Sequence, residues 1–175
     1  MKILRKVGNS WSQIGGDIEG EAAGGDESGR SVSLSGNGNI VAIGARHSDG
    51  NGTDSGHERV YACNTTSWVK LGEDIDGEAG DDRSDHSVSL SGNGTTMVAN
   101  GAIYSDDNGS NSGHVKLYAY RNTSWVQLGQ DIDGEAAGDN FGLSAQQPAS
   151  ASMASPRTIA SSIANTISHP TQTNH

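Results

Sequence analysis

The sequence predicts an all-β protein assembled from repeated units of four antiparallel strands. Three observations lead to this prediction: a repeat of 57 residues, short segments in which polar and apolar residues alternate, and frequent glycines between those segments. Trp11, Trp68 and Trp125 occupy matching positions whose numbers differ by 57 each time. No segment has the 3.6-residue apolar period of an amphipathic helix.

Each full repeat contains four short segments of strand character, separated by clusters of Gly, Asn, Asp and Ser. In the second repeat these segments are residues 68–72, 87–91, 96–102 and 114–120. Val88, Ser89 and Leu90 alternate between apolar and polar, which is typical of a strand with one buried and one solvated face. Four antiparallel strands in a unit of this length predict one blade of a β-propeller.

The repeat divides the chain into five parts. Residues 1–10 align with residues 115–124, so we expect the last strand of a preceding blade there, formed by Met1–Leu4. Residues 11–67 and 68–124 are two full repeats, and residues 125–144 begin a third. Two full blades are fewer than the ~4–8 that close a propeller. The prediction is therefore an incomplete propeller.

The last part of the chain, residues 145–175, lacks acidic residues and is rich in Ser, Thr, Ala and Pro. Such a composition predicts a disordered tail, because it offers little apolar surface to bury. A Ser/Thr-rich stalk and a prematurely ended gene product are the alternatives. At the other end, the first residues have a basic start without the apolar stretch of a secretory signal peptide.

Composition and charge exclude several classes of function. A net charge of −10 repels nucleic acid and anionic membranes, and no apolar run is long enough for insertion into a membrane. Cys63 is the only cysteine, so the chain has neither an intrachain disulfide nor a Cys/His zinc motif. No nucleophile–base motif and no phosphate-binding loop is present, so we do not expect an enzyme.

Several short motifs recur at fixed places in the repeat. Phe141-Gly142 opens a unit, a strand of sequence SVSLS follows in the two full repeats, and Gly-Ala closes the next strand at residues 44–45 and 101–102. The segment GHVKLYAY, residues 113–120, ends the unit. In these motifs residues 1–144 resemble the FG-GAP repeat, the blade of integrin-α-type β-propellers.

The sequence also departs from the family pattern. Ser28-Gly29 and Ser84-Asp85 stand in place of Phe-Gly. Arg46 and Ile103 replace the proline of the Gly-Ala-Pro motif. The family's calcium loop of alternating aspartates falls on residues 35–39 and 91–95, neither of which holds a carboxylate. Because Ca²⁺ requires charged oxygen ligands, we expect this inherited site to be lost.

The resemblance implies a function as well as a fold. It implies a non-catalytic recognition module of the adhesion type, extracellular or on the cell surface, with a protein or glycan ligand. A lectin-like, glycan-binding propeller and a fragment without an independent function are the alternatives. Further blades of a longer chain, or self-association, would complete the propeller. Five Asn-x-Ser/Thr sequons also favour an extracellular setting: Asn51, Asn64, Asn93, Asn108 and Asn122.

Two acidic segments remain as candidate calcium sites. The first follows each tryptophan and comprises Asp74, Asp76, Glu78 and Asp82, then Asp131, Asp133, Glu135 and Asp139, and more loosely Asp17, Glu19, Glu21 and Asp26. Carboxylates at alternate positions converge on a hard cation where a glycine bends the chain. The alternative is a solvated edge loop whose like charges oppose pairing with another sheet edge.

The second acidic segment precedes the last strand of each repeat. It comprises Asp49, Asn51 and Asp54, and in the next repeat Asp106, Asp107 and Asn108. These residues either cap the backbone of their own turns or contact a cation or a sugar. His57, His114 and the tryptophans recur with the unit, whereas a catalytic residue is needed only once. We therefore expect them to be structural.

Overall fold

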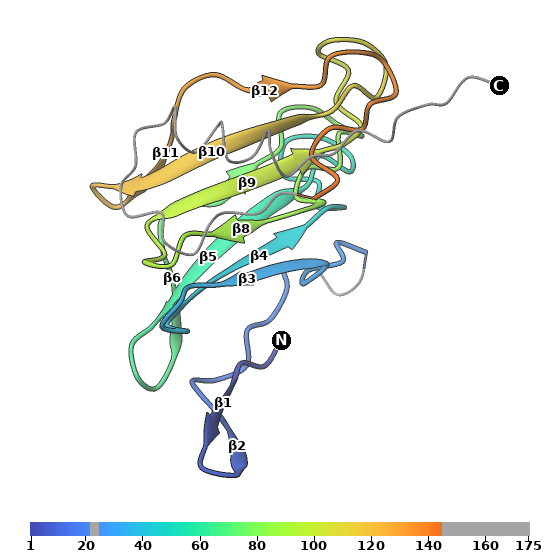
Figure 1. Ribbon diagram of the computed structural model, residues 1–175. Coiled ribbons are helices and arrows are strands. Elements are labelled where there is room, and N and C mark those ends of the chain that lie inside the picture. The colour runs from blue at the N-terminus through green and yellow to red at the C-terminus, as the bar shows by residue number, and fades with distance from the viewer. Residues whose placement is uncertain (22–24, 145–175) are drawn as a thin grey trace, which may run out of the picture.

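The computed structural model describes residues 1–21 and 25–144 (Figure 1). Within this part of the chain the protein is all-β, which confirms the predicted fold class. The same residues contain no helix that is long and apolar enough to cross a membrane. The predicted disordered tail, residues 145–175, lies outside the described residues.

Ten of the strands form two antiparallel sheets of the same design. The first sheet has the order β3 (Ser31–Leu34), β4 (Ile40–Ala45), β5 (His57–Cys63) and β6 (Trp68–Lys70), with β7 (Ile75–Asp76) also paired to β5. The second has the order β8 (Ser89–Leu90), β9 (Thr96–Ala102), β10 (His114–Arg121) and β11 (Ser124–Gln127), with β12 (Ile132–Asp133) also paired to β10. The predicted four-stranded blades are thus present, each with a short additional edge strand.

The sheets are displaced along the chain relative to the sequence repeats. Trp68 opens the second repeat, but its strand β6 completes the first sheet by pairing with β5. Likewise, Trp125 lies on β11, which pairs with β10 in the second sheet. Each blade therefore takes its outer strand from the following repeat.

A separate hairpin lies beside the first sheet (Figure 1). It pairs β1 (Leu4–Val7) with β2 (Ser10–Gln13), the strand that carries Trp11. The hydrogen bond from Ile14 N to Ile3 O, at 3.0 Å, extends the pairing toward the N-terminus. The strand expected at Met1–Leu4 is thus observed at Leu4–Val7, with backbone pairing continued on its N-terminal side.

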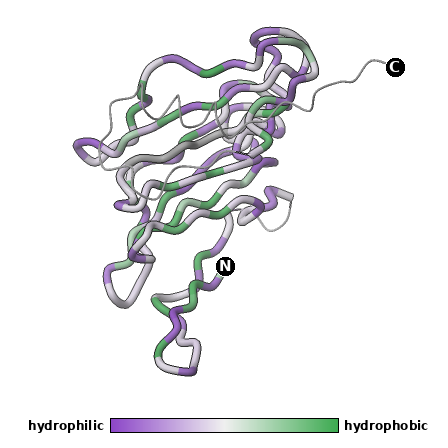
Figure 2. Tube along the Cα trace, viewed as in Figure 1, coloured by the Kyte–Doolittle hydropathy of each residue, from purple (hydrophilic) through white to green (hydrophobic). Residues whose placement is uncertain are grey.

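The hydrophobic core lies between successive sheets. Ala42 and Val60 of the first sheet pack against Val88 and Leu90 of the second. The opposite face of β4 packs its Val41 against residues of the hairpin segment. Because β4 is buried on both faces, its sequence IVAIGA is apolar throughout rather than alternating. Figure 2 shows hydrophobic residues along these strands and hydrophilic residues in many of the loops.

The residues at the Phe-Gly position of one unit meet the Gly-Ala motif of the neighbouring unit. Gly113 forms a β-bridge with Phe141, and a Cβ atom added to Gly101 would lie 1.8 Å from the carbonyl oxygen of Gly142. In the first sheet, a Cβ atom on Gly44 would lie 2.8 Å from the Cβ of Asp85. Only glycine permits such a close approach of two backbones, which explains why Gly-Ala recurs.

Candidate functional site

The second acidic segment of each repeat lies beside the first acidic segment of the next repeat, at one end of the sheets. Asn51 Nδ2 donates hydrogen bonds to the carbonyl oxygens of Gly77 and Glu78, at 3.0 and 3.1 Å. Asn108 Nδ2 makes the equivalent bond to Gly134 O at 2.9 Å. Residues 46–56, 77–84, 103–113 and 134–140 therefore form one surface, here termed the acidic rim.

Several predicted ligands in the acidic rim accept hydrogen bonds from the backbone of their own loops. Asp49 Oδ1 accepts from Asp54 N at 2.9 Å, and Asp106 Oδ1 accepts from Asn111 N at 2.7 Å. Asp82 and Asp139 accept from the backbone amides of the residues three positions before them, Ala79 and Ala136. These carboxylates stabilise the turns, as Asp does in loops with left-handed residues.

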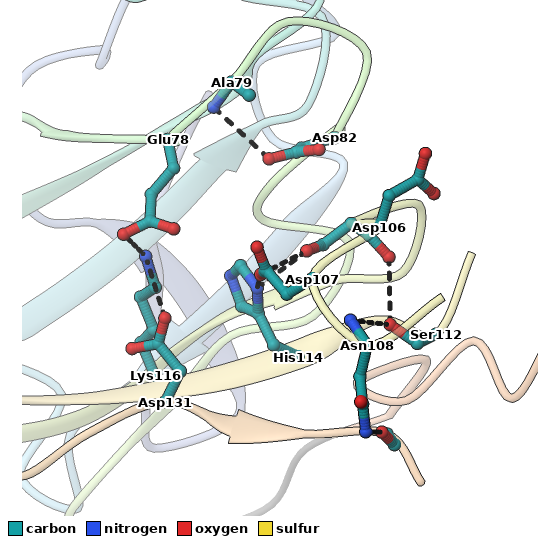
Figure 3. Close-up of polar contacts among 12 residues, drawn as sticks. Glu78, Ala79, Asp82, Asp106, Asp107, Asn108, Ser112, His114, Lys116 and Asp131 are labelled. Carbon is teal, nitrogen blue, oxygen red and sulfur yellow. Dashed lines mark hydrogen bonds and ion pairs between the residues drawn. The ribbon is translucent and has the colours of Figure 1, made fainter. Parts of the chain in front are cut away.

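Four side chains from separate segments converge at the edge of the acidic rim (Figure 3). One ligand atom from each of Glu78, Asp107, His114 and Asp131 lies within 4.8 Å of the other three. Glu78 belongs to the edge loop of the first sheet, whereas the other three belong to the second sheet and its loops. The junction of the two sheets therefore joins carboxylates that the sequence places in different clusters.

Lys116 lies in the middle of this group. Its Nζ contacts Glu78 Oε1 and lies 3.6 Å from Asp131 Oδ2, and the residue is only 2% exposed. The ammonium group already supplies the positive charge that the two carboxylates require. A metal ion would therefore have to displace Lys116 or share the carboxylates with it.

His114 is the buried member of the group. Its Nδ1 lies 3.0 Å from Asp107 Oδ2 and 3.1 Å from Ser105 Oγ. Hydrogen bonds from Ser105 and His114 hold the pKa of the Asp107 carboxyl below its usual value. Within residues 1–21 and 25–144, the buried Nε2 of His114 has no hydrogen-bond partner. Zinc, which accepts histidine nitrogen, fits this donor set better than calcium.

The first sheet has an equivalent cluster with a different basic residue. Arg59 occupies the position of Lys116 and binds Asp74 through Nε and Nη2, at 3.0 and 2.8 Å. Arg59 also contacts Glu21, which is equivalent to Glu78. Burial opposes ionisation of Asp74, but hydrogen bonds from Arg59 and Lys70 lower its pKa. Gly50 stands where the second cluster has Asp107.

The remaining predicted ligands lie outside these clusters. Asp76 and Asp133 lie on the short edge strands β7 and β12, opposite His57 and His114. Asp54 lies 3.0 Å from the Nδ1 of His47. Glu135 accepts the 3.5 Å hydrogen bond of Asn108 through its backbone oxygen. His114 was expected to be structural from the sequence, and Lys116 was not among the predicted site residues. The recurrence of a basic residue two positions after each rim histidine was the available signal.

A pocket opens in the acidic rim where the two sheets meet. It has a volume of about 350 Å³ and is lined by Asp81, Arg83, Tyr104, Asp106, Ser110 and Asn111. The guanidinium carbon of Arg83 lies 5.2 Å from the centre of the Tyr104 ring, and Tyr104 is 37% exposed. Among these residues, only Asp106 was a predicted site residue. Tyr104 is a lone aromatic residue within a polar loop. That feature of the sequence could have indicated the other residues of the pocket.

Two carboxyl groups are fully buried between the sheets. Glu58 on β5 and Asp85, which precedes β8, interact electrostatically with each other. Burial raises the pKa of Asp85 to about 7, and burial together with Asp85 raises the pKa of Glu58 well above its usual value. Asp85 has a left-handed backbone with φ of 74°, where the other units have Gly29 and Gly142. The sequence did not predict this pair.

The loops that match the family's calcium loop lie between β3 and β4 and between β8 and β9, at the opposite end of the sheets from the acidic rim. In the first of them, Asn37 Oδ1 accepts hydrogen bonds from Ser35 Oγ and Asn39 N, at 2.9 and 3.0 Å. Asn93 does the same in the second loop, with Ser91 Oγ and Thr95 N. An asparagine amide thus supplies the oxygen that closes each loop.

Comparison with known proteins agrees with the repeat pattern. Residues 11–61 match the family model described as the FG-GAP repeat. The matched segment begins at Trp11 on β2 and continues through β3 and β4 into β5. No curated protein matches the chain.

Proposed function

Because residues 11–61 of this chain carry an FG-GAP repeat, we propose that the protein is a non-catalytic recognition module of the adhesion type, acting outside the cell or on its surface. Its ligand binds at the acidic rim, in the pocket around Tyr104. The sheets provide a rigid frame, and the loops at one end present the contacting side chains.

The composition of the rim pocket is the main support for this proposal. An aromatic ring lies among Asp81, Asp106 and Asn111, and Arg83 fixes the ring from one side. Binding sites combine an apolar surface with a few placed polar groups in this way. Tyrosine contributes a large contact area and loses little conformational entropy on binding.

A glycan ligand is the second candidate. Sugars present hydroxyl groups, which Asp and Asn side chains bind through hydrogen bonds, and C–H faces, which pack on aromatic rings. Tyr104 with Asp81 and Asn111 offers both kinds of contact. This ligand class suits the pocket better than an anionic one, because the surrounding loops are acidic.

The test measures binding of the 175-residue chain to a glycan array and, in parallel, to intact cells. The Tyr104→Ala variant should lose binding by about tenfold or more, since a central aromatic contact is expected to contribute at least 1.4 kcal/mol. Val126→Ala is the control, because Val126 is also exposed but lies on β11, outside the pocket. Equal binding by Tyr104→Ala and the unchanged chain would contradict the proposed site. Chemical turnover of a bound ligand would contradict the non-catalytic role.

A further inference from the structure

Two of the three equivalent tryptophans lock one unit onto the preceding one. Trp68 Nε1 donates a hydrogen bond to Ile14 O at 2.9 Å, and Trp125 Nε1 donates to Leu71 O at 2.7 Å. Both acceptors lie 54 residues before their tryptophan. The contact is therefore a repeated feature of the way the units stack.

A glycine beside each acceptor makes room for the indole ring. A Cβ atom added to Gly15 would lie 2.7 Å from Trp68 Cδ1, and one added to Gly72 would lie 3.0 Å from Trp125 Cδ1. Any larger residue would therefore meet the ring. The lock consists of a tryptophan on one unit and an Ile-Gly or Leu-Gly socket on the other.

The third tryptophan and the third socket are both open in the described structure. Trp11 is 67% exposed, although it is equivalent to Trp68 and Trp125. At the other end of the chain, Leu128-Gly129 is equivalent to Leu71-Gly72, and no atom lies within 4 Å of a Cβ atom placed on Gly129. A pocket of about 530 Å³ opens there, lined by Gln127, Gly129, Gln130, Asp131 and Asp133.

Charged residues pair between successive units in the same way as the tryptophans and their sockets. Arg59 and Lys116 each contact one carboxylate of the preceding unit, Glu21 and Glu78 respectively. The third basic residue of this set is Lys2, which lies 3.9 Å from Asp17 of its own unit. The third acidic residue is Glu135, an exposed residue without an ion pair in the part of the chain that the structure describes.

We propose that the protein self-associates head to tail, with Trp11 of one copy seated on Leu128-Gly129 of another. Lys2 of the first copy then faces Glu135 of the second, as Arg59 faces Glu21 and Lys116 faces Glu78. The β1–β2 hairpin takes the place of the outer strands of a further blade. Such an interface joins two different surfaces, so it builds rings if the rotation closes and open chains if it does not.

The first experiment measures the mass of the 175-residue chain in solution by sedimentation over a dilution series. We expect oligomers that dissociate on dilution. Trp11→Ala and Gly129→Asn should each weaken association by about tenfold or more, because they remove the tryptophan or fill its socket. Asparagine is chosen because it tolerates the left-handed backbone of Gly129, whose φ is 82°.

The chain offers a matched control for each variant. Val7→Ala shortens another exposed apolar residue of the hairpin. Gly138→Asn places the same residue at a glycine with φ of 83° and equally open surroundings. Both controls should associate like the unchanged chain. Circular dichroism should show the same β-sheet content in all four variants, because none of the altered side chains is buried.

Mixing the two defective variants tests the head-to-tail geometry. The Trp11→Ala variant keeps its socket and the Gly129→Asn variant keeps its tryptophan, so their mixture should form mixed dimers and nothing larger. An interface between identical surfaces would give no such rescue. An unchanged chain that stays monomeric at every concentration would overturn the proposal, and would indicate that other residues of the same chain cover the socket. Association that persists in both defective variants would also overturn it.

Discussion

The hairpin–first sheet junction and the first sheet–second sheet junction are built alike but differ in their charged groups. Both have a tryptophan lock, made by Trp68 in the hairpin junction and by Trp125 in the sheet junction. The basic residue in the rim cluster is Arg59 in one and Lys116 in the other. The buried Glu58–Asp85 pair belongs to the sheet junction.

Stacking of the units requires the tryptophan lock, but it does not require particular charged groups at the junction. The indole ring and its glycine socket recur because two sheets meet there at a fixed distance. The pair Glu58–Asp85 has Val115 and Gly142 as its equivalents one unit later, so the same backbone accommodates two carboxyl groups or none. Groups that occur at one junction only, such as the Glu58–Asp85 pair, therefore give the protein properties that the repeat alone does not.

The largest expected effect is the loss of a tryptophan lock. Trp125→Ala should lower the free energy of unfolding by about 3 kcal/mol, because it removes a ring that packs on the core and on Tyr120 and leaves a cavity. Trp68→Ala should cost somewhat less, since Trp68 has no ring pair like that of Trp125 with Tyr120 among the residues that the structure describes. Trp11→Ala should leave the unfolding free energy of the monomer unchanged. Urea unfolding of the three variants measures this order, and an equal loss at Trp11 would contradict it.

Replacing Lys116 tests whether its ammonium group occupies a site that a metal ion would otherwise bind. Lys116→Met should cost about 2 kcal/mol, because it leaves Glu78 and Asp131 without their counter-charge. The group Glu78, Asp107, His114 and Asp131 then becomes free for Zn²⁺. The melting temperature of this variant should rise in Zn²⁺ relative to chelator, since a ligand that binds only the folded state stabilises it.

The matched variant is Arg59→Met in the equivalent cluster. It should gain less from Zn²⁺, because Gly50 takes the place of the Asp107 ligand. The unchanged chain should melt at the same temperature in Zn²⁺, in Ca²⁺ and in chelator. A zinc-dependent rise of the same size in the unchanged chain would show that Lys116 does not block the site.

The buried carboxyl pair predicts that the sheet junction weakens as pH rises. The folded protein retains protons on Asp85, whose pKa is raised to about 7, and on Glu58, whereas the unfolded chain releases them near their usual values of 3.8 and 4.5. The stabilisation is therefore complete below about pH 4 and is lost as pH rises through about 7. The slope approaches about 1.4 kcal/mol per pH unit for each proton released on unfolding.

The control variant replaces Glu58 and Asp85 with the residue types found at the equivalent positions one unit later, Val115 and Gly142. The Glu58→Val, Asp85→Gly double variant should remove this pH dependence, and it relieves the left-handed backbone of Asp85. Urea unfolding at several pH values between 4 and 8 measures both proteins. The same slope in the double variant would assign the pH dependence to other groups, of which Asp82 is one because burial raises its pKa.

The smallest expected effect concerns the two asparagine-closed loops. Asn37→Ala and Asn93→Ala should each cost about 1 kcal/mol, the usual net contribution of a hydrogen bond, because each removes an acceptor used by at least two donors. Both loops serve the same purpose, so their losses should agree within a few tenths of a kcal/mol. Thermal melts of the two variants measure the difference, and a much larger loss at one loop would show that the loops are not equivalent.

Much of the fold was predictable because its signals are local. Val88, Ser89 and Leu90 alternate as a strand with one buried face does, and Gly44 and Gly101 mark the close approaches. The assignment of Trp68 to the outer edge of the first sheet was not predictable in this way. Strand pairing depends on hydrogen bonds across sheets, and the sequence period is the same wherever the unit is taken to begin.

The rim clusters were even less predictable from the sequence, because they form only when one sheet stacks on the next. Glu78 and Asp107 lie in different loops of different sheets, and no spacing in the chain predicts that their carboxylates and the His114 ring approach within 4.8 Å. The basic residue between them was visible only as a recurrence, at Lys2, Arg59 and Lys116. From sequence alone, a charged residue on a strand is expected to face solvent. Only the stacked structure shows that a neighbouring sheet covers it.

By itself, the sequence determined the repeat, the four-stranded unit and the glycines at which units approach, because each rests on the conformational preference of a few neighbouring residues. The tertiary structure decided which carboxyl groups are buried together, which are neutralised by Lys116, and which tryptophan remains exposed. Burial and distance between units control all three, and both arise only when one sheet stacks on the next.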